Sequence, residues 1–131
     1  MSSRGSKTKN GHVTTTEYQT VRMVEDAKVL QGTSSKQHGL PDYSHSPNSN
    51  YIKENSDRTF REFRAYNSDG FPILEIGYHA EPHLTGNRHD KVLHYHTFDT
   101  DLKRTLGGIV SKTSHSDIYE KYRKYLKEYG L

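Results

Sequence analysis

The scarcity of aliphatic and phenylalanine side chains limits what this chain can fold into more than any other feature. Leu, Ile, Val and Phe account for 24 of the 131 residues, below the roughly 20% under which packed cores become hard to build. Ten tyrosines offset the shortage, because a tyrosine ring buries a large apolar area although its hydroxyl still needs a partner. We therefore expect one small domain with a modest, tyrosine-rich core.

Composition excludes several classes of protein. No apolar run approaches the ~18 residues of a membrane helix, and the first residues lack the apolar centre of a signal peptide, so we expect a cytoplasmic protein without membrane contact. The lack of cysteine excludes disulfides, thiolate catalysis and cysteine zinc sites. The net charge of +3 resides in the first 16 residues, which carry three basic side chains and no acid, so the remainder is electrically balanced.

The N-terminal half offers few periodic signals. Residues 1–16 are predicted to form a disordered basic tail, and residues 17–131 to form a single domain. Apolar side chains recur every three residues from Glu17 to Leu30, which predicts a short helix. The stretch Gln31–Asp57 is rich in Gly, Pro, Ser and Asn and shows no periodicity, so we expect a long loop there.

The C-terminal half predicts a small sheet and a helix. Two β-prone runs, Thr59–Tyr66 and Phe71–Tyr78, flank a turn that ends in Gly70, as in a hairpin. Lys91–Phe98 predicts a third strand, and Ile109–Val110 a short edge strand. The last segment is predicted to be a helix, since five apolar side chains fall on one of its faces. These are Ile118, Tyr122, Tyr125, Leu126 and Tyr129. The expected fold class is α+β, with three to four antiparallel strands, the C-terminal helix on one face and the candidate site on the other.

A histidine cluster is the strongest functional signal. Five of the nine histidines lie within 18 residues, accompanied by Glu75, Glu81 and Asp90. They are His79, His83, His89, His94 and His96. Because imidazole titrates near neutrality and also ligates transition metals, the cluster is compatible with acid–base catalysis and with metal binding.

The first hypothesis is a metal-independent ribonuclease. Alternation along the third strand projects His94 and His96 to the same face, where they could act as general base and general acid on a phosphodiester. Arg64 would then bind the phosphate as a guanidinium fork, with His79 nearby. No cofactor is required, RNA is the expected substrate, and the four catalytic candidates are His94, His96, Arg64 and His79.

Two alternatives from other classes remain open. In one, the cluster binds a transition metal such as zinc, with ligands drawn from His94, His96, His79, His83 and Glu75. In the other, the chain is a non-catalytic interaction or inhibitor protein that contacts a host or immunity protein.

Several segments resemble small domains of phages and other bacterial mobile elements, found at the ends of minor head (head morphogenesis) proteins and in polymorphic-toxin arrays. The similar segments are 29–32, 36–39, 64–66, 70–72, 74–79 and 94–96, the last reading His-Tyr-His. In the related pattern two acids precede an aromatic residue and a histidine. Here Glu75 matches the first acid and Gly77 replaces the second. The resemblance implies a toxin-like or nuclease-like activity.

Overall fold

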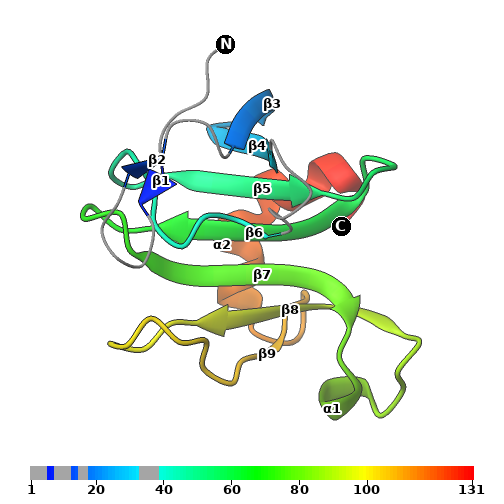
Figure 1. The fold of residues 1–131 in the computed structure, drawn as a ribbon. Coiled ribbons are helices and arrows are strands. Elements are labelled where there is room, and N and C mark those ends of the chain that lie inside the picture. Colours follow the sequence, from blue (N-terminus) through cyan, green and yellow to red (C-terminus); the bar gives the residue numbers. More distant parts are fainter. Residues whose placement is uncertain (1–5, 8–12, 15–17, 33–38) are drawn as a thin grey trace.

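The dominant element of the computed structural model is a mixed sheet of seven strands (Figure 1). The structure describes residues 6–7, 13–14, 18–32 and 39–131. Across the sheet the strands run in chain order: β3 (Tyr18–Val24), β4 (Ala27–Gly32), β5 (Asn50–Glu54), β6 (Phe60–Tyr66), β7 (Pro72–Ala80), β8 (Lys91–Thr97) and β9 (Gly108–Ile109). All neighbours are antiparallel except β4 and β5, which are parallel. The predicted fold class, an α+β domain with three to four antiparallel strands, is therefore wrong.

The helix predicted over Glu17–Leu30 is also wrong, because the described part of this segment is the β3–β4 hairpin. Its turn places Glu25 at a φ of 54°, in the left-handed region. The spacing of three that imitates a helix has a local cause, since the register shifts between Thr20 and Arg22. Such a bulge inserts one residue and breaks the two-residue alternation of a strand. Val21, at the bulge, is 47% exposed.

The predicted loop Gln31–Asp57 contains a strand. β5 lies within it and pairs with β4 through only two residue pairs, Lys28 with Tyr51 and Val29 with Ile52. Beyond Val29 and Ile52 the two strands have no further partner pairs. The junction between the β3–β4 hairpin and the rest of the sheet is therefore short.

The other predicted strands are confirmed. β6 and β7 form the expected hairpin, and β8 adds to β7 in antiparallel register. The expected edge strand is β9, which pairs with β8 through His94 and Tyr95. A four-residue helix, α1 (Pro82–Thr85), connects β7 and β8.

The C-terminal helix α2 (Ser116–Leu126) covers one face of the sheet, as predicted. A short 3-10 turn, η1 (Lys127–Tyr129), extends it. The core between helix and sheet is rich in aromatic rings: Phe63 stacks against Tyr125 at 4.8 Å and contacts Tyr122 at 5.2 Å between ring centroids. The main core members are Val24, Ala27, Val29, Ile52, Phe60, Phe63, Ala65, Leu74, Ile76, Leu93, Val110, Tyr119, Tyr122, Tyr125 and Leu126.

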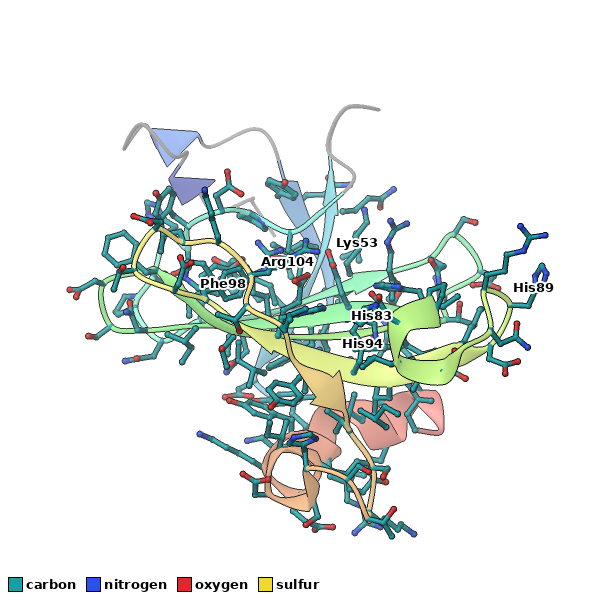
Figure 2. The ribbon with its side chains drawn as sticks, turned by 90° about the horizontal axis from the view of Figure 1, so that it is seen from below. Lys53, His83, His89, His94, Phe98 and Arg104 are labelled. Carbon is teal, nitrogen blue, oxygen red and sulfur yellow. The ribbon has the colours of Figure 1, made fainter. Side chains whose placement is uncertain are left out.

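The opposite face of the sheet carries a second, smaller cluster of buried hydrophobic side chains and, beside it, polar side chains (Figure 2). The members of this cluster are Tyr18, Leu30, Leu40, Tyr51 and Tyr66. Figure 2 shows Lys53, His83, His94 and Arg104 on the side of the sheet away from α2. Most of the predicted tail, residues 1–16, lies outside the described residues, which there comprise only β1 (Ser6–Lys7) and β2 (Val13–Thr14), an antiparallel pair. Within the described part of the chain, no helix has the length and apolar character needed to cross a membrane.

Candidate metal centre

Strands β7 and β8 position the histidine cluster through their register. Gly77 pairs with His94. Two residues further along β7, His79 pairs with Val92, which precedes His94 by two residues in the antiparallel strand β8. Because side chains alternate between the two faces of a strand, His79 and His94 both lie opposite the core face that carries Ile76 and Leu93. The imidazole rings of His79 and His94 meet edge to face, with 4.5 Å between centroids.

Glu81 completes a group of three potential ligands. It follows β7 directly, and its Oε1 lies 3.2 Å from His94 Nε2 and 3.6 Å from His79 Nδ1. One ligand atom from each of His79, Glu81 and His94 lies within 4.8 Å of the others. Donor atoms around a tetrahedral zinc ion, each about 2.0–2.1 Å from it, are separated by roughly 3.3 Å. The two separations from Glu81 are close to this value, so small side-chain movements would bring the three donors around one ion.

In its neutral form, the imidazole of His94 directs the lone pair of Nε2 toward Glu81. His94 is 1% exposed, and burial lowers the pKa of its imidazole. His79 and His96 act in the same direction, whereas the hydrogen bond to Val92 and the carboxylate of Glu81 act against it. A neutral ring carries one proton, and His94 Nδ1 lies 2.9 Å from the carbonyl oxygen of Val92, so this nitrogen donates. Nε2 is then an acceptor facing a carboxylate oxygen. Two acceptors at this distance repel unless a proton or a metal ion lies between them.

Gly77 provides the room for the two rings. A β-carbon at this position would lie 3.1 Å from His94 Nε2 and 3.2 Å from His79 Nε2. Both values are tighter than nearly all real contacts of a β-carbon, so any larger side chain would push the imidazoles away. The glycine that replaces the second acid of the resembling pattern thus allows both histidines to lie close to the sheet.

Two further histidines border the group without joining the three ligands. His83 Nδ1 lies 3.2 Å from Glu81 Oε2, the carboxylate oxygen that does not face His94. This contact holds the orientation of the carboxylate, as outer partners of metal ligands commonly do. His96 packs against His94 at 5.3 Å between centroids, and its Nδ1 lies 2.8 Å from the carbonyl oxygen of Thr105.

Arg64 and Glu75 are committed to each other. Arg64 is 6% exposed and Glu75 is 3% exposed, and they form an ion pair at 3.2 Å. Arg64 also donates to the carbonyl oxygens of Leu40 and Pro41. Arg104 approaches the second oxygen of Glu75 at 2.7 Å. Neither Arg64 nor Glu75 is therefore free to bind a phosphate or a metal ion.

Glu62 lies beside this pair and next to Gly77 in the register of the sheet. Burial raises the pKa of its carboxyl to about 7, helped by a hydrogen bond to Glu75 and by the negative charge of that residue. Burial also acts to raise the pKa of Glu75, but the hydrogen bond with Glu62 and the charges of Arg64 and Arg104 outweigh it, so the pKa of Glu75 is lowered. Below about pH 7 the proton bound by the two carboxyls therefore resides on Glu62.

The structure brings together only some of the residues that the sequence singles out. His79, His94 and His96 lie side by side, and His83 is next to them through Glu81. Arg64 lies on the predicted face but is buried, and Glu75 is bound to it. Sequence reasoning assigns Glu81 no ligand role. The signal that could have found it is the alternation His79-x-Glu81 at the end of a strand, which places both side chains on one face.

Comparison with protein-family models, with curated proteins and with solved structures finds no match to this chain.

Proposed function

We propose that the protein is a metal-dependent hydrolase in which His79, Glu81 and His94 bind one divalent transition metal ion such as zinc. The observation that carries this proposal is the convergence of one ligand atom from each of His79, Glu81 and His94 within 4.8 Å, with His94 Nε2 at 3.2 Å from Glu81 Oε1. Two imidazoles and one carboxylate form a ligand set typical of hydrolytic zinc sites. In the described residues the ion pairs of Glu81 involve histidines alone.

The accessibility of the group supports a catalytic role over a purely structural one. The side chain of His79 is 51% exposed and that of Glu81 is 18% exposed, whereas His94 is buried. Structural zinc sites are closed by four protein ligands, while catalytic sites keep a position for water. A metal ion held here would supply an activated water at neutral pH. The chain's own contribution is to fix three donors on the open face of a rigid sheet.

The metal-free ribonuclease that the sequence suggests is the second candidate. The contact between the rings of His94 and His96 favours it, because two adjacent imidazoles could act as acid and base. The pairing of Arg64 with Glu75 removes the phosphate-binding group that this mechanism assigned. The burial of His94 also limits its access to a substrate. The geometry therefore supports metal-assisted hydrolysis better.

A metal titration tests the proposal. Chelator-treated protein, titrated with zinc against a chromophoric chelator, should bind one equivalent, and His94→Ala or Glu81→Gln should weaken binding by about a hundredfold. His89→Ala serves as the control, because His89 is exposed and belongs to the same histidine-rich window. Zinc binding that survives in both ligand variants would overturn the proposed site.

An activity assay then separates the two candidates. Cleavage of a labelled mixed-sequence RNA is measured with chelator and after addition of zinc, for the parent protein and for Glu81→Gln and His96→Ala. Cleavage that requires zinc and Glu81 supports the metal-dependent hydrolase. Cleavage that persists in chelator and requires His96 supports the metal-free mechanism and contradicts the proposal.

A further inference from the structure

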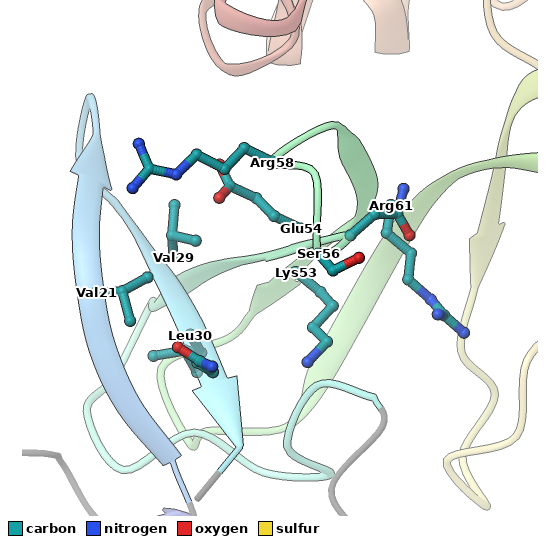
Figure 3. A pocket seen from close by; sticks show the side chains of 10 residues that line it. Val21, Val29, Leu30, Lys53, Glu54, Ser56, Arg58 and Arg61 are labelled. Atoms are coloured by element: carbon teal, nitrogen blue, oxygen red, sulfur yellow. The ribbon is translucent and has the colours of Figure 1, made fainter. Parts of the chain in front are cut away.

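A groove opens where the parallel strands β4 and β5 separate (Figure 3). Its volume is about 610 Å³, within the range of pockets for small ligands. One wall comes from the β3–β4 hairpin and includes Val21, Val29 and Leu30; the other comes from the end of β5 and the turn into β6. The short pairing of β4 with β5 creates this space, because the strands have no partner pairs beyond Val29 and Ile52.

The groove concentrates positive charge. Lys53, Arg58 and Arg61 line it, and none of the three forms an ion pair in the described part of the chain. The one acid in the lining, Glu54, is already compensated, since it forms an ion pair with Arg22 and accepts a hydrogen bond from Tyr129 at 2.6 Å. Because the folded part of the chain is close to electrically neutral overall, three uncompensated cations around one cavity mark a site for an anion.

A bulge aims two of these cations in the same direction. The register passes from Lys53 opposite Glu62 to Glu54 opposite Phe60, so Arg61 is the extra residue. Figure 3 shows Lys53 and Arg61 pointing the same way, and Arg58 standing at the opposite end of the groove. A guanidinium group can donate two parallel hydrogen bonds to two oxygens of one phosphate, and a lysine ammonium adds a compact positive charge.

The floor of the groove is aliphatic. Val29 and Leu30 are buried, whereas the side chain of Val21 is 47% exposed. Val21 therefore presents an apolar surface to a ligand in the groove. A ligand suited to the groove therefore combines an anionic group with a flat or apolar part. We propose that this groove binds a nucleotide, with its phosphate held by Lys53 and Arg61 and its base lying against the exposed side chain of Val21.

The groove and the metal centre lie on one row of the sheet. Lys53 pairs with Glu62, Glu62 with Gly77, and Gly77 with His94. With strands about 4.8 Å apart, the Cα atom of Lys53 is roughly 10 Å from that of Gly77. Nucleotide binding in the groove stands independently of the proposed hydrolase. A single-stranded RNA bound there would extend along this row to the metal ligands.

Binding in the presence of chelator tests the groove without the metal centre. The full-length protein is titrated with adenosine monophosphate, with a labelled ten-nucleotide single-stranded RNA and with inorganic phosphate. We expect Lys53→Gln and Arg61→Gln each to weaken binding about tenfold. The matched control is Arg123→Gln, an exposed arginine of α2 on the other side of the sheet. Val21→Ser should weaken binding of the monophosphate but leave binding of inorganic phosphate unchanged, because only the nucleotide carries a base.

Comparison of the probes also shows whether the phosphate belongs to a single nucleotide or to RNA. Binding of both the monophosphate and the RNA, weakened by the groove variants, supports a site for one nucleotide unit. Binding of the RNA alone, weakened in the same way, supports the same site with a polymer as its ligand. Absence of binding by either probe at millimolar concentration, or equal weakening by Arg123→Gln, overturns the proposal. Circular dichroism of each variant verifies that the fold is retained.

Discussion

On the face of the sheet opposite α2, the chemistry of a residue depends on how deeply its side chain is buried and on which groups it contacts. Arg64 is the clearest case, since the sequence marks it as a phosphate fork and the structure makes it the partner of a buried carboxylate. Glu62 is another, because its proton affinity depends on the charge of Glu75 beside it. Strand alternation predicts the face on which such residues lie, but the segment around Leu40 and Pro41 that covers Arg64 is recognisable only in the structure.

The shift at Glu62 predicts how stability depends on pH. The pKa of Glu62 rises from 4.5 to about 7 on folding, so between these values the folded state holds a proton that the unfolded state has released. The free energy of unfolding should therefore fall as pH rises through this range, by about 3 kcal/mol in total. Glu62→Gln keeps a donor toward Glu75 without titrating, so this fall should be absent from the variant. Its stability should instead rise slightly with pH, because the pKa of His94 is lowered on folding.

Urea denaturation in chelator at a series of pH values measures this effect, with the exposed Glu120→Gln as control. Glu75 contributes in a different window. Its lowered pKa gives stability that is present above the unfolded pKa and is lost as pH falls through the folded value. A parent protein whose stability, relative to that of Glu62→Gln, does not fall between about pH 5 and pH 8 would contradict the assigned protonation of Glu62.

At the scale of elements, the sequence predicts the strands and the helix that local patterns determine. It misses the strands of a hairpin that contains a bulge and a short strand in a segment with the composition of a loop. The β6–β7 hairpin, β8 and α2 follow from turn residues, alternation and an apolar helical face, and each is found. The β3–β4 hairpin is misread, because a bulge at Val21 gives its apolar residues a helical spacing. β5 is missed because it has only five residues and lies in a stretch rich in Gly, Pro, Ser and Asn, although it forms an antiparallel hairpin with β6.

The bulge between β5 and β6 shows the same limit. Strict alternation predicts Phe60 on the face of Glu62 and Arg64, whereas Phe60 and Phe63 both belong to the core. The extra residue, Arg61, restores Phe60 to the buried side and places a cation at the groove. The histidine cluster could be predicted from composition. That its carboxylate partner is Glu81 and not Glu75 could not, because it depends on the ion pair between Arg64 and Glu75.

A glycine on β7 provides a test at the level of this strand. Gly77→Ala should lower zinc affinity by about ten- to a hundredfold, because its β-carbon would displace the rings of both His79 and His94. The backbone at this position lies outside the left-handed region, so alanine introduces no strain there. Gly39→Ala is the matched control, since its β-carbon would meet only Glu62 Oε1, at 3.8 Å. Unchanged zinc affinity in Gly77→Ala would show that the two rings do not bind a common ion.

At the scale of the whole molecule, the C-terminal helix ties together parts of the sheet that pair only weakly. The β3–β4 hairpin joins the remaining strands through two parallel residue pairs. Tyr125, on α2, donates a hydrogen bond to Asp26 in the hairpin turn, 99 residues away in the chain. Tyr129, in η1, donates to Glu54 at the end of β5, and Glu54 in turn binds Arg22 of β3. The tyrosines that compensate for scarce aliphatic residues thus also supply polar links across the junction.

These links predict where the molecule opens first when they are removed. The double variant Tyr125→Phe/Tyr129→Phe keeps the buried rings but deletes both hydroxyls, so each change should cost about 1 kcal/mol. Because the lost contacts hold the β3–β4 hairpin, hydrogen exchange should accelerate in β3 and β4 more than in β7 and β8. The control is Tyr119→Phe, whose hydroxyl donates to the carbonyl of Leu131 within the same C-terminal segment. Since the hairpin forms one wall of the groove, the double variant should also weaken nucleotide binding. Uniform acceleration across all strands would instead mean that hairpin and sheet unfold as one unit.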